Sequence, residues 1–210
     1  MQKIKLYRHP LSGHCHRVEL FMSLLGLPYE TEDVDLVAGA HKAPAFLKLN
    51  AFGQVPVILD GDVVLADSNA ILLYLAERYA PGRWWSSEPL QAAAVQRWLS
   101  AAAGDLASGP ATARLITVFG KNADPAPVIA RAHALFSVIE GTLAETRFIA
   151  GDSPTIADIA LYSYTSHAPE GNVSLDTYPR LKAWLARIEA LPGFIGMART
   201  PAGLQAELVS

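Results

Sequence analysis

The segment from Phe52 to Tyr74 constrains the fold of this chain more than any other part of its sequence. Two short apolar runs, residues 55–59 and 63–65, flank an Asp60-Gly61 pair, which is the strongest short-range signal for a tight β-hairpin. Ser68 then stands where a helical pattern begins and can cap its first turn. The sequence therefore predicts a hairpin followed at once by a helix.

The two ends of this segment carry groups that suit a zwitterionic ligand. Pro56 precedes the first strand, where a proline marks an edge or a special backbone geometry, and the sequence leaves a cis bond open. The start of the helix offers backbone N–H groups and a positive dipole end to a carboxylate, while Asp67 can pair with an ammonium group. A peptide terminus carries both of these charges.

Composition restricts the classes of partner. With 51% hydrophobic residues, the 210-residue chain can bury a sizeable core in one large domain or two small ones. A net charge of −3 supplies no basic surface for nucleic acid or an anionic membrane, so we expect small-molecule partners. The longest near-continuous apolar run, residues 70–76, is too short to span a bilayer, and residues 1–10 do not resemble a signal peptide. A single cysteine, Cys15, excludes an intrachain disulfide and fits a cytoplasmic location.

The order of predicted elements divides the chain into two parts. Residues 3–7 and 29–34 are typical of strands, and residues 15–25 and 43–49 of helices, so residues 1–80 predict a mixed sheet with helices packed on it. We place a linker at residues 81–88, where prolines, glycines and tryptophans punctuate the chain. The expected fold class is an α/β domain followed by an all-α domain.

Residues 89–210 show helical patterns and no strand signals. Helices are predicted over residues 89–106, 111–119, 125–146 and 181–191, with Gly109 and Pro110 expected to interrupt the first two. Thr155 and Asp158 form a capping box at the start of a further helix. We expect these two residues to stabilise the fold and to make no contact with substrate.

The run Gly53-Gln54-Val55-Pro56, the hairpin and the acidic–serine pair together resemble the glutathione-binding site of the cytosolic glutathione transferases. The resemblance extends over most of the chain, and it implies a thioredoxin-like N-terminal domain, a helical C-terminal domain and a homodimer. In that family the proline is cis, the residue before it contacts the glutathione backbone, and the acidic–serine pair holds the γ-glutamyl end. These roles correspond to Val55, Pro56, Asp67 and Ser68.

Three further positions complete the glutathione side of this resemblance. His41 and Lys42 match a pair that reaches the glycine carboxylate in phi-like enzymes, and Gln54 would contact the peptide backbone. Two positions depart from the family pattern. Ala51 replaces a usual proline, and an aspartate at position 67 replaces the commoner glutamate and has a shorter reach.

Glutathione chemistry needs a thiolate, and a thiol with a pKa near ~8.5 is mostly protonated at neutral pH. The run from His9 to Arg17 contains a His-Pro-x-Ser pattern before a helical arginine, which resembles the phi class and more distantly the theta and zeta classes. Their catalytic serine corresponds to Ser12. A hydroxyl at a helix N-terminus can donate a hydrogen bond to the sulfur, and the helix dipole adds favourable charge.

Other residues near Ser12 have alternative interpretations. Tyr7 is a rival donor, but its spacing from Arg17 differs by one residue from the tyrosine classes, and a one-residue slip in a strand reverses the face. Cys15 lies one turn beyond the position of the catalytic cysteine in omega and beta relatives, which favours a buried helical residue. Arg17 could add positive field near the sulfur or form an ion pair between helix and sheet. His14, Cys15 and His16 together could suggest a metal site, but we expect none, because adjacent residues on a helix point in different directions.

The resemblance implies conjugation of glutathione to a small hydrophobic electrophile. A glutathione-dependent isomerase, dehalogenase or peroxidase on the same scaffold is an alternative, as is a non-catalytic transferase-like binding module. Because ligand sites favour domain interfaces, the helical half should supply most of the electrophile pocket. The residues proposed for its wall are Leu11, Trp98, Ala102, Leu106, Arg114 and Tyr164.

Overall fold

The computed structural model, which describes residues 3–208, contains two compact units. The first comprises the chain up to Trp85 together with Leu191–Ala198, and the second comprises Ser86–Ala190 and the chain from Arg199 onward. The division that we placed at residues 81–88 from the sequence did not predict that Leu191–Ala198 belongs to the first unit. The backbone of Gly193 explains part of this return, because a Cβ at Gly193 would lie 2.7 Å from the carbonyl oxygen of Ser23.

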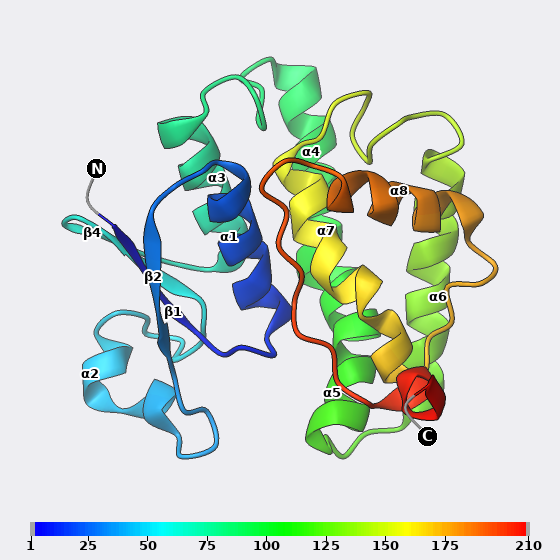
Figure 1. Cartoon of the computed structure of the whole chain (residues 1–210), viewed down its shortest axis with the longest axis horizontal. Coiled ribbons are helices and arrows are strands. Elements are labelled where there is room, and N and C mark those ends of the chain that lie inside the picture. The colour runs from blue at the N-terminus through cyan, green and yellow to red at the C-terminus, as the bar shows by residue number, and fades with distance from the viewer. Residues whose placement is uncertain (1–2, 209–210) are drawn as a thin grey trace. The chain divides into compact units, whose positions relative to one another are not determined.

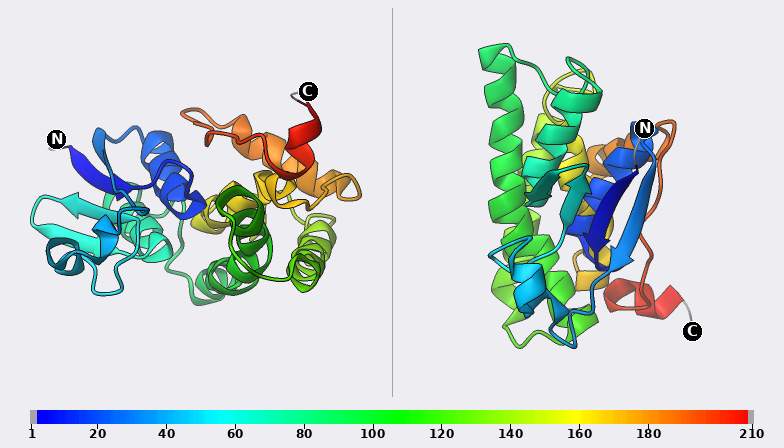
Figure 2. Two further views of the ribbon diagram at one scale, coloured as in Figure 1. Left: turned by 90° about the horizontal axis from the view of Figure 1, so that it is seen from below. Right: turned by 90° about the vertical axis from the view of Figure 1, so that its left-hand side faces the viewer.

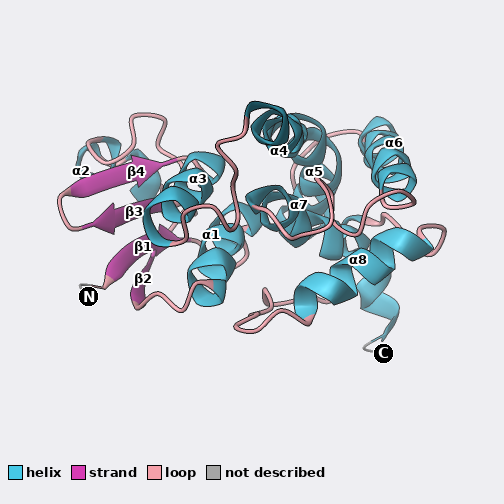
Figure 3. Ribbon diagram, turned by 90° about the horizontal axis from the view of Figure 1, so that it is seen from above, coloured by secondary structure: helices cyan, strands magenta, loops and turns pink. Residues whose placement is uncertain are grey.

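The first unit is a four-stranded mixed sheet with strand order β2-β1-β3-β4 (Figure 3). β1 pairs in parallel with β2 and antiparallel with β3, and β3 pairs antiparallel with β4. The strands are β1 (Ile4–Arg8), β2 (Tyr29–Asp33), β3 (Val57–Asp60) and β4 (Val63–Ala66). This arrangement confirms the predicted α/β class of the N-terminal half.

Helices cover both faces of this sheet (Figures 1 and 3). Alternate residues of β1 face opposite sides, so Ile4 and Leu6 share one buried face while Tyr7 packs on the other with Val34 and Phe46. Phe46 belongs to α2. The helices of this unit are α1 (Gly13–Leu24), the short η1 (Ala40–Lys42), α2 (Pro44–Leu47) and α3 (Ser68–Tyr79).

The hairpin and the helix after it form as predicted, but two local details differ. Asp60 pairs with Val63, so the two-residue loop is Gly61 with Asp62, and Gly61 supplies the positive φ of 60° that this turn requires. The expectation that Ser68 caps α3 is wrong. Asp67 is the N-cap residue, and its side chain accepts hydrogen bonds from the backbone nitrogens of Asn69 (2.9 Å) and Ala70 (3.0 Å).

The described part of the second unit contains helices and no named β-strand, which confirms its all-α class. A continuous column of helix runs through its first three elements (Figure 2). These are α4 (Pro89–Ala101), the π-helix η2 (Ala102–Ala111) and α5 (Thr112–Phe119). The remaining elements are α6 (Pro125–Thr142), α7 (Ile156–Ser166), η3 (Ala168–Gly171), α8 (Pro179–Glu189) and η4 (Gly203–Leu208).

The expected interruption at Gly109 and Pro110 is wrong, because both residues lie inside the π-helix. The wider turn changes which backbone groups pair, so a proline that would break an α-helix is accommodated. Thr112 stabilises the widened turn by donating its hydroxyl to the carbonyl of Ala107, 2.9 Å away. Gly109 also packs closely on α6, where a Cβ would lie 3.0 Å from the backbone nitrogen of Ala132.

The predicted capping box at the start of α7 is present, and it belongs to a larger buried network. Asp158 accepts hydrogen bonds from the backbone nitrogen and the hydroxyl of Thr155, the backbone nitrogen of Ile149 and the indole of Trp184. Burial raises the pKa of the Asp158 carboxyl, and these hydrogen bonds oppose that rise. One carboxylate therefore joins α7, the segment before it and α8. No described helix has the length and apolar character needed to cross a membrane.

Candidate functional site

One edge of the sheet brings the predicted glutathione residues together. Tyr7 of β1 pairs with Val57 of β3, and Val57 pairs with Ala66 of β4. Because the three residues are in register, the segments beside them must emerge at the same edge. These segments are the loop from His9 to Ser12, the Val55-Pro56 pair and the Asp67-Ser68 pair. The peptide bond between Val55 and Pro56 is cis, as in the family pattern.

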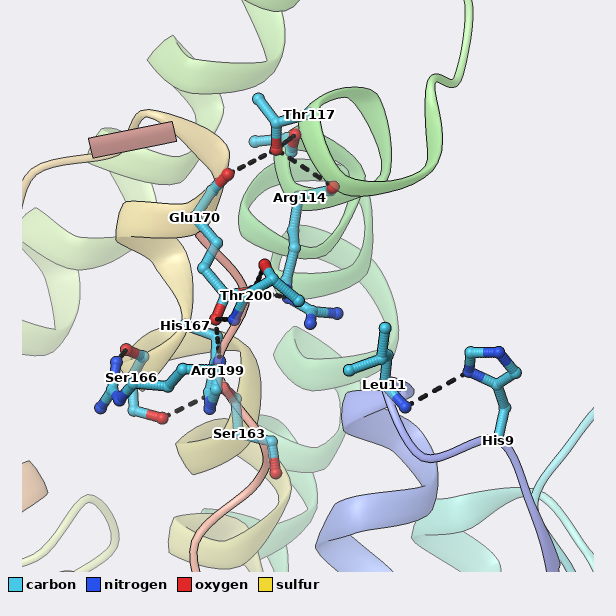
Figure 4. Close-up of polar contacts among 11 residues, drawn as sticks. His9, Leu11, Arg114, Thr117, Ser163, Ser166, His167, Glu170, Arg199 and Thr200 are labelled. Atoms are coloured by element: carbon cyan, nitrogen blue, oxygen red, sulfur yellow. Dashed lines mark hydrogen bonds and ion pairs between the residues drawn. The ribbon is translucent and has the colours of Figure 1, made fainter. Parts of the chain in front are cut away.

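Ser12 is the N-cap of α1 and is half-buried. Its Oγ accepts a hydrogen bond from the backbone nitrogen of Cys15, 3.3 Å away. A hydroxyl that accepts in this way keeps its own hydrogen to donate. The Cys15 sulfur is one nearby acceptor, since burial raises the pKa of the Cys15 thiol and a side-chain hydrogen bond from Ser12 opposes this larger effect. The preceding loop is held by His9, whose carbonyl accepts a hydrogen bond from the backbone nitrogen of Ser12. Nδ1 of His9 accepts from the backbone nitrogen of Leu11 (Figure 4).

The two rivals of Ser12 lie in different surroundings. Cys15 is 1% exposed, and burial raises the pKa of its thiol to about 11, which disfavours a thiolate at neutral pH. Tyr7 packs in the apolar cluster around Phe46, with the two rings 6.0 Å apart and nearly perpendicular. Both environments are typical of residues that stabilise a core.

Asp67 and Ser68 place a carboxylate and a hydroxyl side by side at the N-terminus of α3. Asp67 has a left-handed φ of 71°, and its Oδ1 receives both capping hydrogen bonds. Ser68 is 4% exposed, and its hydroxyl accepts a hydrogen bond from Nη1 of Arg17, 3.2 Å away. Arg17 thus connects α1 to the start of α3. The sequence had suggested two other roles for Arg17, a positive field near the sulfur or an ion pair between helix and sheet.

The loop before the cis-proline is held from two sides. The ammonium of Lys42 donates to the carbonyls of Phe52 (3.0 Å) and Gly53 (2.9 Å), which leaves one of its three hydrogens for a ligand. Asn50 donates to the carbonyl of Gln54 and accepts from the nitrogen of Phe52. Sequence reasoning did not identify Asn50, although an asparagine before a glycine-containing turn is a recognisable signal. Nδ1 of His41 is buried and has no hydrogen-bond partner among residues 3–208.

The residues proposed for the electrophile pocket occupy varied positions. Leu11 belongs to the first unit and is half-buried. The proposed residues of the second unit are buried within that unit, namely Trp98, Ala102, Leu106, Arg114 and Tyr164. Trp98 also lines a cavity of about 310 Å³ between α4 and α6. The other residues of that cavity are Arg97, Ala101, Asp105, Arg131, Ala134, Leu135 and Val138.

Arg114 is 2% exposed and forms a buried ion pair with Glu170, in which Nε lies 2.6 Å from the carboxylate (Figure 4). His167 donates to the other carboxylate oxygen at 2.7 Å, and Thr200 donates both its backbone nitrogen and its hydroxyl. Although burial alone would raise it, these bonds lower the pKa of Glu170 to about 2. The backbone carbonyl of Glu170 accepts from the hydroxyl of Thr117. This network fastens α5, η3 and the C-terminal segment of the second unit together.

No group of three or more histidine, cysteine, aspartate or glutamate side chains within the described residues could hold a metal ion. The groups gathered at the sheet edge are instead hydroxyls, a carboxylate, an ammonium and helix N-termini. These are suited to an organic ligand with both charges.

Comparison with known proteins identifies the family. Residues 2–77 match the family model described as "Glutathione S-transferase, N-terminal domain", and residues 105–192 match "Glutathione S-transferase, C-terminal domain". Glutathione S-transferase 3 of Zea mays is 37% identical over 205 residues, covering 92% of each chain. Human glutathione S-transferase theta-2 is 31% identical, covering 90% of this chain and 82% of the relative.

Solved structures agree with these sequence matches. A glutathione S-transferase from Pseudomonas fluorescens superposes with a TM-score of 0.88 at 33% identity, covering 93% of this chain and 99% of the other. A glutathione transferase homolog from Drosophila mojavensis, solved with bound glutathione, has a TM-score of 0.82 at 30% identity and covers 91% of this chain and 90% of its own. The chain therefore belongs to the glutathione S-transferase family and is a transferase that acts on glutathione.

Proposed function

We propose that this protein conjugates the glutathione thiolate to small hydrophobic electrophiles, as in detoxification, and that Ser12 stabilises the thiolate. The observation that supports this most is the geometry of Ser12, whose hydroxyl caps α1 by accepting and so keeps its hydrogen as a donor. Ser12 lies at the same sheet edge as the Val55-Pro56 and Asp67-Ser68 pairs. A sulfur held there meets a fixed hydrogen-bond donor and the positive end of α1.

The remaining groups at this edge match the charges of glutathione. Ser68 and the backbone of α3 would bind the γ-glutamyl carboxylate, and the second carboxylate oxygen of Asp67 would bind the ammonium. The backbone of Val55, set by the cis bond to Pro56, would pair with the cysteinyl backbone, and Gln54 would contact the peptide beside it.

The glycine end would meet His41 and Lys42, of which Lys42 retains one ammonium hydrogen and His41 one unpaired ring nitrogen within the described residues. We propose glutathione as the co-substrate and propose no metal. Leu11, Trp98, Ala102, Leu106, Arg114 and Tyr164 remain our proposed set for the electrophile pocket.

Retention on immobilised glutathione, followed by conjugation of a chlorinated nitroaromatic, tests this function. We expect both retention and conjugation. Retention with activity only toward organic peroxides, haloalkanes or isomerisable substrates would instead support the peroxidase, dehalogenase or isomerase alternatives. Retention with no turnover of any of these substrates would contradict the proposed conjugation. Failure to bind glutathione would contradict every enzymatic function named here and would support the non-catalytic module, which keeps the fold and loses the site.

Substitution of Asp67 should separate binding from chemistry. Asp67→Asn keeps the capping oxygen but removes the charge opposite the ammonium, so we expect the KM for glutathione to rise about tenfold with kcat nearly unchanged, since a hydrogen bond to a charged group contributes about 1.5–3 kcal/mol. Steady-state kinetics at saturating electrophile measure both constants. Asp62→Asn, in the exposed hairpin loop, is the matched control. An equal fall in kcat for Asp67→Asn would contradict this division of roles.

We further propose that the protein is a cytoplasmic homodimer that uses the face of the second unit between α4 and α6. Val138 lines the cavity there and is 59% exposed, and the face carries Arg97, Arg131 and Asp105. A two-fold axis would place its opposite charges against each other. Sedimentation should give twice the mass of the chain for the wild type and a monomer for Val138→Glu. Val64→Glu, an exposed position on β4, is the control, and a monomeric wild type would refute the proposal.

A further inference from the structure

We propose that Arg17 is a positioning residue for glutathione, acting through the Ser68 hydroxyl, which it holds in the orientation that donates to the γ-glutamyl carboxylate. This inference rests on the proposed glutathione site and adds a residue from a different helix to it. Arg17 belongs to α1 and is 1% exposed, whereas Ser68 begins α3.

The direction of the hydrogen bond between these residues is fixed by their chemistry. A guanidinium only donates, so the 3.2 Å contact from Nη1 of Arg17 must occupy a lone pair of the Ser68 oxygen. A second contact from the same nitrogen, 2.8 Å to Oδ1 of Asn69, orients the guanidinium from the next residue of α3. Ser68 therefore receives from Arg17 and has its one hydrogen left to give.

His14 is another neighbour of the Ser68 oxygen, with Nδ1 at 3.5 Å. Burial, with a contribution from the charge of Arg17, lowers the pKa of His14 to about 3, so the ring is neutral near pH 7. If Nδ1 carries the hydrogen, Ser68 accepts twice and its own hydrogen must go elsewhere. If Nδ1 is bare, it is an acceptor at a distance longer than a good hydrogen bond, and a carboxylate replaces it readily.

The buried charge of Arg17 also strengthens the bond that Ser68 makes. A cation donating to a hydroxyl polarises it, so the hydroxyl donates more strongly to an anion on its other side. The chain from guanidinium through hydroxyl to carboxylate lies in surroundings of low dielectric constant, where such coupling is larger than in water. Arg17 would thus contribute to affinity for the carboxylate with no direct contact to it.

A double-mutant cycle between Arg17 and Ser68 tests this relay. The dissociation constant for glutathione is measured by calorimetry for the wild type, Arg17→Met, Ser68→Ala and the double variant, after thermal unfolding shows which variants are folded. We expect about a tenfold loss of affinity for each single variant, in line with hydrogen bonds to charged groups. The double variant should bind no more weakly than Ser68→Ala, because Arg17 acts only through the hydroxyl.

A second ligand distinguishes this role from a structural one. A glutathione analogue that lacks the γ-glutamyl α-carboxylate should bind equally to the wild type and Arg17→Met, since no anion faces Ser68. Asn69→Ala, which keeps the charge of Arg17 but removes its orienting contact, should give a smaller loss of glutathione affinity with kcat unchanged. It provides the measurement if Arg17→Met does not fold.

Four results would overturn the inference in distinguishable ways. Losses that multiply in the double variant, or an equal loss of affinity for the analogue, would show that Arg17 acts independently of Ser68 while leaving the glutathione site intact. Unchanged affinity in both Arg17→Met and Asn69→Ala would show that Arg17 does not contribute to glutathione binding, again leaving the glutathione site intact. Unchanged affinity in Ser68→Ala would refute the assignment of the glutathione site itself.

Discussion

Replacing Asp158 by alanine is expected to lower the free energy of unfolding by about 3–5 kcal/mol, because each buried donor left without its acceptor costs about 1–3 kcal/mol. This loss of stability exceeds the ~1 kcal/mol expected for an ordinary helix cap, because the carboxylate also accepts hydrogen bonds from residues outside the capping box. Its two oxygens receive four hydrogen bonds, and its side chain is fully buried. Alanine would leave the indole of Trp184 and the nitrogens of Ile149 and Thr155 without an acceptor.

Urea unfolding followed by circular dichroism measures this loss. Asp152→Ala is the matched control, because Asp152 is an exposed aspartate six residues before Asp158. Like most surface substitutions, it should lower the free energy of unfolding by less than about 0.5 kcal/mol. Asp158→Asn should fall between the two, since the amide keeps one acceptor but turns a donor toward the others. A loss near 1 kcal/mol for Asp158→Ala would mean that only the helix cap depends on this carboxylate.

Local signals predicted the fold well wherever a short motif determines a structure. The Asp60-Gly61 pair predicted a hairpin, the Thr155–Asp158 spacing predicted a capping box, and both are present. The position of the sheet edge also follows from the sequence once the strands are paired. Residues of the candidate site are close in space because they border the same edge, which depends on the order of the strands and not on details of packing.

What sequence could not predict depends on contacts between distant residues. Asp67 and Ser68 are adjacent and both can cap a helix, and only the left-handed backbone at Asp67 decides between them. Pro110 was expected to break a helix, because nothing local signals the π-helix around it. The partnership of Arg17 with Ser68 joins residues 51 positions apart, so no spacing rule could have revealed it.

Replacing Ser12 by alanine is expected to lower kcat for conjugation about a hundredfold while changing the KM for glutathione by less than about threefold, as for removal of one preorganised donor to a developing charge. Without the hydroxyl, the bound thiol loses the donor that favours its anion, and its pKa should move up toward ~8.5. The rising limb of kcat against pH, and the ultraviolet absorbance of the bound thiolate, should therefore both shift to higher pH. The shift is to higher pH because a hydrogen-bond donor to the thiolate lowers the pKa of the thiol, and removing that donor raises this pKa.

Three variants separate this role from the alternatives. Ser12→Thr keeps a hydroxyl and an N-cap, so it should restore much of the rate, whereas loss of the cap alone costs about 1 kcal/mol of stability and would not move a pH profile. Cys15→Ala should retain conjugation, because a thiol with a pKa near 11 in a buried site contributes no thiolate at neutral pH. Tyr7→Phe should also retain it, since Tyr7 packs against Phe46 on the α2 side of the sheet. If Ser12→Ala remained fully active while Cys15→Ala or Tyr7→Phe lost activity, the donor to the thiolate would be that other residue, and the N-terminus of α1 would serve only to hold the helix.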